Sequence, residues 1–250
     1  MEENLRIIVK NIGKKFKKDF KKKEGILAGL LSFFHREPDV LFYALKDISF
    51  EAKEGEIIGI IGKNASGKST LLRIIGGIYK PSDGIVKTHG KIVYLSGFGF
   101  GLITKLTMRE NIYLAGSIMG LSQNDIRNKF DEIVEFSGFK DYVDTRLYQF
   151  STGMIARLNF SITMLCVKHQ NPDILLLDEV FSAGGDFEFR EKAIKKMEEL
   201  LKCGATILLV SHELDLIEKY CDKIILIENG KIIKQGKPKE VIEGYLKSLV

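Results

Sequence analysis

The segment Gly62–Thr70 constrains this chain more than any other, because it reads GKNASGKST and fits the pattern GxxxxGK[ST]. An apolar run, Glu56–Ile61, precedes it, and a helical pattern over Leu71–Ile75 follows it. Glycines let such a loop wrap closely enough for backbone N–H groups to face phosphate oxygens, and the following helix presents its positive dipole end. A chance glycine-rich turn is the alternative, but the position between a strand and a helix favours a nucleoside triphosphate site.

This loop predicts two ligands, ATP and Mg²⁺. We expect the Lys68 ammonium to reach the β- and γ-phosphates and the Ser69 hydroxyl to ligate Mg²⁺. A guanine nucleotide is not expected, because no Asn-Lys-x-Asp segment occurs in the sequence. The other loop residues expected to line the phosphates are Gly62, Lys63, Asn64, Ala65, Ser66, Gly67 and Thr70.

Two carboxylates end a second apolar run, Ile174–Leu177. Charges at the edge of a core are costly to desolvate unless a cation or water meets them. We therefore expect Asp178 to hold Mg²⁺ through water and Glu179 to polarise the water that attacks the γ-phosphate. An ordinary acidic pair at a helix N-terminus is the alternative, and the neighbouring phosphate loop argues against it.

A second anion-binding element is predicted at Ser151–Met154, which opens a long apolar helix. Ser151 fits an N-cap, and the free N–H groups beyond it, near Gly153, would face an anion. A plain capped helix is the alternative. Two phosphate-binding elements in one chain indicate that each is used in a different half of a sandwich.

The order of strand and helix patterns predicts an α/β fold, with a P-loop NTPase core, a mostly parallel sheet, antiparallel β elements and an inserted helical subdomain. Asn229-Gly230 between two apolar runs predicts a hairpin. We expect one domain over 1–250, with the helical subdomain at about 107–170 and a C-terminal helix at about 237–250. The expected strands are Leu5–Val9, Ile48–Ala52, Glu56–Ile61, Ile92–Leu95, Ile174–Leu177, Thr206–Val210, Lys223–Ile227 and Lys231–Lys234; the expected subdomain helices are Glu110–Met119, Gln123–Phe136 and Ser151–His169.

The apolar stretches and the first residues predict a location inside the cell. The longest apolar stretches fall short of the ~20 residues that span a bilayer as a helix, and the first residues lack a secretory signal. We expect a cytoplasmic protein. Three widely spaced cysteines, Cys166, Cys203 and Cys221, are expected to be reduced, buried thiols.

A lysine-rich stretch over 14–23 opens an irregular segment, about 17–43, with an apolar middle around Ile26–Phe34. It would suit a surface that faces anionic lipid headgroups or the cytoplasmic helices of a partner. A loop folded over the domain's own core is the equal alternative, and both remain open.

With these motifs in this order, the chain resembles the ATP-binding cassette (ABC) family over nearly its whole length. Gly62–Thr70 is similar to the Walker A loop, Ile174–Asp178 to the Walker B strand and Ser151–Met154 to the signature motif. The resemblance implies that Glu179 is the catalytic glutamate and that His212, after Thr206–Val210, is the switch histidine contacting the γ-phosphate. It further implies a D-loop at Ser182–Asp186 and an aromatic that stacks on adenine, for which Phe16 is the candidate and Tyr43 the rival.

The resemblance also implies partners. Two copies of the chain would bind two ATP molecules head to tail, each between one Walker A loop and the other copy's signature, and hydrolysis would drive a multi-span membrane permease. The chain would then lie on the inner face of the plasma membrane through that permease.

Two departures from the family point to one branch. The signature reads Ser-Thr-Gly-Met instead of Ser-Gly-Gly-Gln, and the glycine-rich stretch Ser96–Gly101 stands where the family has a Q-loop glutamine. With the segment over 17–43, these features resemble the ATPases that export bacterial O-antigen, capsule or teichoic acid. The resemblance leaves open which glycan, which permease and which residue replaces the glutamine. It also leaves open whether a sugar-binding domain follows Val250.

The alternative function is a soluble ABC ATPase that acts on nucleic acid or ribosomes, which the basic patch would allow. Lys68 and Ser151 lie too close in sequence to enclose a long coiled coil, and there is one cassette rather than a tandem pair. No nucleic acid partner is therefore expected. A non-catalytic binding module is disfavoured, because it would have little need of Glu179 and His212.

Overall fold

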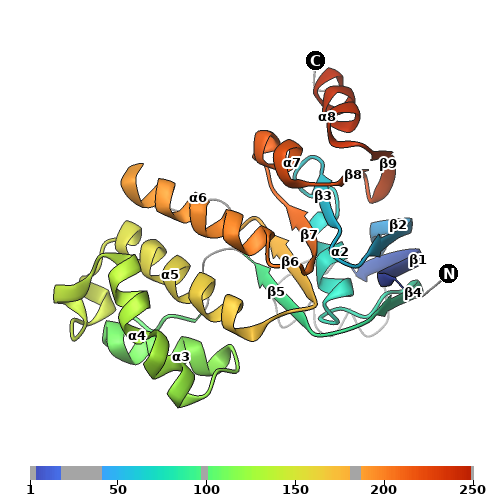
Figure 1. Ribbon diagram of the computed structural model, residues 1–250. Coiled ribbons are helices and arrows are strands. Elements are labelled where there is room, and N and C mark those ends of the chain that lie inside the picture. Colours follow the sequence, from blue (N-terminus) through green and yellow to red (C-terminus); the bar gives the residue numbers. More distant parts are fainter. Residues whose placement is uncertain (1–3, 18–40, 97–100, 181–186, 249–250) are drawn as a thin grey trace, which may run out of the picture.

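A six-stranded sheet forms the centre of the protein (Figure 1). The computed structural model describes residues 4–17, 41–96, 101–180 and 187–248. Five strands run parallel, and the last pairs antiparallel with its neighbour at one edge. This arrangement confirms the predicted α/β fold class. Across the sheet the order is β5 (Ile92–Ser96), β6 (Ile174–Asp178), β7 (Thr206–Val210), β3 (Ile57–Ile61), β8 (Lys223–Glu228) and β9 (Lys231–Gly236).

A smaller antiparallel sheet lies beside the central one, in the order β2 (Leu41–Lys53), β1 (Leu5–Lys17) and β4 (Asp83–Thr88). The predicted strands were too short here, since β1 and β2 are 13 residues each. Asn11 and Asp47 have positive φ, and the Asn11 side-chain amide donates to Asp47 Oδ1 at 2.9 Å. These irregularities shift the register and interrupt the apolar alternation that marks a strand.

Helices cover both faces of the central sheet and form a separate layer at its β5 edge (Figure 1). The helices packed around the sheet are α2 (Lys68–Ile75), α6 (Phe187–Leu201), α7 (Leu214–Tyr220) and α8 (Pro238–Lys247). The helical subdomain contains α3 (Met108–Ile118), α4 (Gln123–Ser137), α5 (Thr152–Gln170) and two short 3₁₀ segments, η1 (Lys140–Tyr142) and η2 (Leu147–Gln149).

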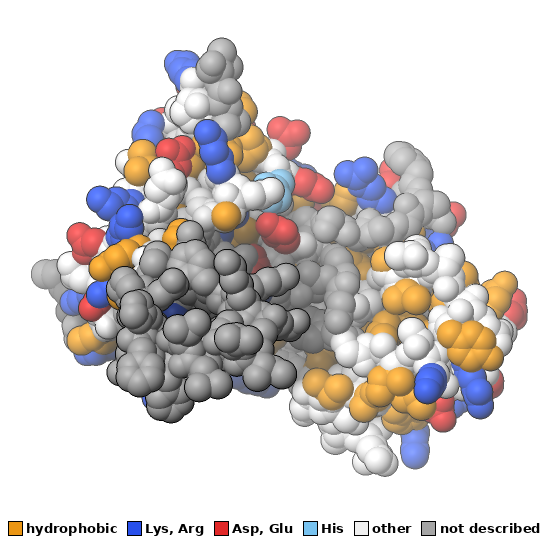
Figure 2. Space-filling view, turned by 180° about the vertical axis from the view of Figure 1, so that it is seen from behind, with side chains coloured by type: hydrophobic (Ala, Val, Ile, Leu, Met, Phe, Trp, Pro, Cys, Tyr) orange, Lys and Arg blue, Asp and Glu red, His pale blue; other side chains and the backbone are white. Residues whose placement is uncertain are grey.

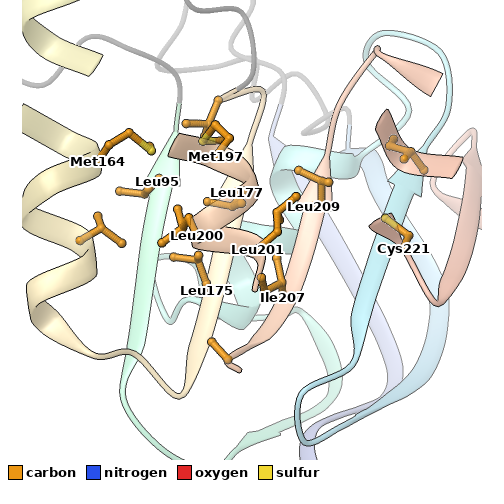
Figure 3. Close-up of a cluster of buried hydrophobic side chains, with 14 of the residues drawn as sticks. Leu95, Met164, Leu175, Leu177, Met197, Leu200, Leu201, Ile207, Leu209 and Cys221 are labelled. Atoms are coloured by element: carbon orange, nitrogen blue, oxygen red, sulfur yellow. The ribbon is translucent and has the colours of Figure 1, made fainter. Parts of the chain in front are cut away.

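Two hydrophobic clusters sandwich the parallel strands. In β6, Leu175 and Leu177 face one cluster, whereas Ile174 and Leu176 face the other, as the alternation of side chains along a strand requires. Figure 3 shows the first cluster, in which Met164, Met197 and Leu200 pack onto Leu175 and its neighbours. The second cluster packs against α2 and therefore fixes the helix that carries Lys68.

The helical subdomain has its own core and well-defined helix ends. Thr107 and Glu110 form a capping box at the start of α3, and Ser122 and Asp125 form another at the start of α4. Gly138 ends α4 with a φ of +77°. These local signals explain why the sequence pattern located these helices to within two residues.

Cys166 and Cys221 are buried as expected, and burial raises the pKa of the Cys166 thiol to about 11 and that of Cys221 to about 12. Cys203 is exposed, which corrects the expectation for that residue. Among the helices of the described ranges, none is long and apolar enough to cross a membrane.

Candidate active site

The loop between β3 and α2 is shaped by two glycines in close contact with neighbouring backbone. A Cβ on Gly62, whose φ is +146°, would lie 2.1 Å from Ile227 O. A Cβ on Gly67, whose φ is +111°, would lie 2.6 Å from Ala44 O. Both glycines are therefore required by geometry as well as by the phosphate-binding pattern.

The β8–β9 hairpin holds this loop from outside. The Gly230 N–H donates to Ser66 O at 3.0 Å, and the Lys46 N–H donates to Gly230 O at 2.7 Å. The Asn229-Gly230 pair predicted the turn, but nothing in its pattern indicated that the turn would contact the phosphate loop. The central sheet, the small sheet and the loop thus meet at Gly230.

Lys68 lies inside the curled loop. Its side chain is buried, and Nζ donates to Gly62 O at 2.8 Å and to Lys63 O at 3.0 Å. Burial lowers the pKa of Lys68, and the nearby carboxylates of Glu179 and Asp178 oppose that shift. An anion beside Nζ would favour the charged form of Lys68 and so oppose the effect of burial.

Ser66 supplies an independent test of whether a phosphate fits. Its Oγ is buried and has no hydrogen-bond partner among the described residues. A buried hydroxyl without a partner is costly, and a phosphate oxygen would accept its hydrogen. The remaining loop residues lie at its open side: Lys63, Asn64 and Ala65 are exposed, Ala65 has a φ of +60°, and Thr70 is half-buried in α2.

Ser69 and Asp178 meet across the site, with Ser69 Oγ donating to Asp178 Oδ1 at 3.0 Å. Asp178 is buried at the end of β6. Its other oxygen, Oδ2, accepts a hydrogen bond from the Tyr94 hydroxyl at 3.0 Å. A hydroxyl and a carboxylate are the oxygen ligands that Mg²⁺ takes in proteins, so the donor set fits this ion.

Glu179 and His212 form a second pair, at the ends of β6 and β7. His212 Nε2 lies 3.1 Å from Glu179 Oε1, and both side chains are about half exposed. Glu179 has a φ of +56°, and its N–H donates to Val210 O at 3.0 Å. A non-glycine residue in this conformation is uncommon and is concentrated at functional sites.

The structure brings the predicted catalytic residues together but leaves the signature segment apart from them. Ser151 caps α5, since its Oγ accepts from the Met154 N–H at 3.2 Å, and both Ser151 and Gly153 are exposed. In the described part of the chain, no hydrogen bond or ion pair joins Ser151 to the phosphate loop.

The two aromatic candidates for adenine lie on the small sheet in different surroundings. Phe16 packs edge-to-face on Tyr79, with ring centroids 5.7 Å apart, and Lys14 Nζ lies over both rings. Tyr43 is exposed, with the ammonium groups of Lys15 and Lys46 over its ring. Residues 97–100 of the glycine-rich stretch, the segment Ser182–Asp186 and residues 18–40 lie outside the described residues.

Sequence reasoning missed Tyr94. An aromatic residue in a predicted strand is ordinarily interpreted as core, and Tyr94 is indeed packed against one of the two clusters. Only its position one strand away from Asp178, which the sheet order sets, identifies its hydroxyl as part of the site.

Comparisons with known proteins agree with this geometry. A family model described as ABC transporter matches residues 45–182. The chain is 38% identical over 208 residues to an O-antigen export system ATP-binding protein, RfbB, of Klebsiella pneumoniae, covering 83% of this chain and 82% of that protein. It is 42% identical over 206 residues to the teichoic acids export ATP-binding protein TagH of Lactococcus lactis, covering 82% of this chain and 43% of TagH.

A solved structure shares the fold. The dimeric post-hydrolysis structure of the ATP-binding cassette MJ0796 bound to ADP and Pi has a TM-score of 0.68 at 24% identity, and the match covers 93% of this chain and 98% of that one. The family model spans more than half of the sequence and includes the phosphate loop, Asp178 and Glu179. This protein therefore belongs to the ABC transporter family, as an ATP-binding and ATP-hydrolysing subunit.

Proposed function

We propose that this ATPase powers the export of a lipid-linked cell-surface polysaccharide of the O-antigen, capsule or teichoic acid kind. The observation that carries the ATPase part is the convergence of Lys68, Ser69, Asp178, Glu179 and His212 at one edge of the parallel sheet. The export part rests on the resemblance to RfbB and TagH, whose names state O-antigen export and teichoic acid export.

In the proposed reaction, Lys68 and the loop N–H groups hold the phosphates of ATP. Glu179 takes a proton from a water molecule as that water attacks the γ-phosphorus, and the bond from the γ-phosphorus to the β,γ-bridging oxygen breaks to give ADP and phosphate. His212 holds Glu179 in place and contacts the γ-phosphate. Ser69 and Asp178 would hold Mg²⁺, which neutralises phosphate charge when bound.

Each site is completed by a second copy of the chain. Ser151 and Gly153 are exposed at the N-terminus of α5, where free N–H groups favour an anion. Because they do not touch the phosphate loop of their own chain, we assign them to the γ-phosphate of the partner copy.

Mixing two inactive variants tests this arrangement. Lys68→Ala and Ser151→Ala chains should each hydrolyse ATP poorly, but a mixed dimer contains one site with both residues intact. The mixture should therefore exceed the summed rates of the separate variants. A mixture that shows only the sum would place both residues in the same chain's site and contradict the head-to-tail dimer.

The membrane partner is proposed to be a multi-span permease, which would hold this chain at the inner face of the plasma membrane. Hydrophobic side chains gather on the surface of the helical subdomain (Figure 2). The exposed apolar residues of this subdomain include Ile103, Ile118 and Tyr148, which are 46%, 65% and 60% exposed. Such a patch on the surface marks a site for another protein. The lysine-rich segment over 17–43 is proposed to face that permease or anionic headgroups.

A pull-down of the tagged chain from detergent-solubilised membranes tests the export function, with nucleic-acid and ribosome fractions run alongside. One co-purifying multi-span protein, which stimulates ATP hydrolysis only when residues 18–40 are present, is the expected result. Recovery only from the nucleic-acid or ribosome fractions would support the alternative function, which the net charge of +5 allows, and would end the export proposal.

A further inference from the structure

Both carboxylate oxygens of Asp178 are held, each from a different element. Oδ1 accepts from Ser69 in α2, and Oδ2 accepts from the Tyr94 hydroxyl in β5. Tyr94 pairs with Leu176 in the parallel ladder, so it lies two residues before Ser96, the residue opposite Asp178, and on the same face of the sheet as Ser96. The carboxylate is thus clamped between the helix that follows the phosphate loop and the neighbouring strand.

The direction of the Tyr94 hydrogen bond follows from the chemistry of its partner. The Asp178 carboxylate accepts, so the Tyr94 hydroxyl donates its single hydrogen to Oδ2. The Tyr94 ring packs against the second hydrophobic cluster, which holds this donor beside Asp178.

We propose that Tyr94 is a positioning residue for the divalent cation of the site, an inference that rests on the proposed Mg²⁺-dependent ATPase function. A carboxylate rotates about its last bond unless both oxygens are restrained. The Tyr94 bond fixes the plane of the carboxylate and so directs Oδ1 toward Ser69. Partners of this kind, one contact removed from a metal, orient its ligands and change its affinity.

The test compares the affinity for AMP-PNP, a non-hydrolysable ATP analogue, in excess Mg²⁺ and in EDTA. The dissociation constant in EDTA divided by that in Mg²⁺ measures how much Mg²⁺ strengthens binding, independently of catalysis. Tyr94→Phe retains the ring and the packing but removes the hydroxyl. We expect it to reduce that ratio about 10-fold, with the affinity in EDTA unchanged.

Tyr220→Phe is the matched control. The Tyr220 hydroxyl also donates to a carboxylate, that of Glu198, and this bond joins the end of α7 to α6. This variant should keep the parental ratio. Ser69→Ala serves as the reference for loss of a direct ligand and should reduce the ratio at least as much as Tyr94→Phe.

The outcomes distinguish the role of Tyr94 from the proposed function on which that role rests. A parental ratio for Tyr94→Phe, with a reduced ratio for Ser69→Ala, would overturn the role of Tyr94 and leave the ATPase function intact. Equal weakening of Tyr94→Phe in Mg²⁺ and in EDTA would also overturn it, because the hydroxyl would then act on the nucleotide pocket or on folding. If the parental protein bound AMP-PNP equally well in Mg²⁺ and in EDTA, the proposed Mg²⁺-dependent function itself would be contradicted.

Discussion

His212 Nε2 lies 3.1 Å from Glu179 Oε1, and this contact joins the residues that follow two adjacent strands of the central sheet. Both side chains are about half exposed, so solvent reaches each of them. Glu179 is also fixed at its backbone, where the N–H bonds to Val210 O. The glutamate is therefore held by its side chain and by its main chain, as a group that must meet a water molecule at one position requires.

Replacing Glu179 by glutamine keeps the shape and removes the base. Hydrolysis of ATP should fall about 10²- to 10⁴-fold, the usual contribution of a general base. ATP binding should persist, so ATP-bound dimers should accumulate. Phosphate release and size-exclusion chromatography with ATP measure the two effects, and a parental hydrolysis rate would show that the base is another residue.

Gly62 is expected to tolerate no side chain, since an added Cβ would lie 2.1 Å from Ile227 O at a φ of +146°. Gly62→Ala should lower the free energy of unfolding by about 3 kcal/mol or more, from steric overlap and backbone strain together. Gly77→Ala is the control, because Gly77 also has a positive φ, +74°, but open space around its Cβ.

Gly77→Ala should cost about 1 to 2 kcal/mol, from backbone strain alone. Urea unfolding followed by circular dichroism compares the two variants. Equal losses would mean that the contact between the phosphate loop and the end of β8 does not restrain the native structure.

We propose that adenine stacks on Phe16 rather than on Tyr43, because the Phe16 ring already packs edge-to-face on Tyr79. Stacking of a base on an aromatic ring is worth about 1 to 3 kcal/mol, so Phe16→Ala should weaken ATP binding about 10-fold. Phe16→Tyr should bind normally. Titration of a fluorescent ATP analogue checks this, and a larger loss for Tyr43→Ala would reverse the assignment.

The sequence predicted those elements whose residues carry a strong local signal, such as an apolar run or a turn-forming pair. Thr206–Val210 is the strand β7 without adjustment, and the Asn-Gly pair is the β8–β9 turn. The strand β4 was missed, because Asp83–Thr88 is mostly exposed and lacks the apolar alternation of a half-buried strand. Its place is set by pairing with β1, which a local pattern does not contain.

The candidate site likewise contains residues that a local sequence pattern predicts and contacts that only the fold creates. The phosphate loop and the two carboxylates carry their chemistry in consecutive residues, so a local sequence pattern is enough to predict them. Tyr94 acts on Asp178 only because β5 and β6 are neighbours in the sheet, and Gly230 reaches Ser66 only because the hairpin folds back over the loop. Contacts of this kind depend on sheet order, which follows from the packing of the whole domain.

Arg157 links the helical subdomain to α6, and its planar side chain makes that link. Its guanidinium carbon lies 4.9 Å from the Phe139 ring centroid and 4.7 Å from that of Phe189, and Nη2 donates to Ser137 O at 2.9 Å. Gly138 allows this approach, because a Cβ there would lie 2.7 Å from Nη2. The arginine thus fills a space between two aromatic rings and a buried helix end.

Lysine retains the charge but neither stacks as a plane nor forks its hydrogen bonds. Arg157→Lys should therefore lower the free energy of unfolding by about 1 to 3 kcal/mol, the range for a desolvated cation–π contact and a charged hydrogen bond. Arg127→Lys, on the exposed side of α4, should change it by less than about 0.5 kcal/mol. Urea unfolding measures both, and equal stability of the two variants would mean that the charge of Arg157, rather than its planar contacts, joins the helical subdomain to α6.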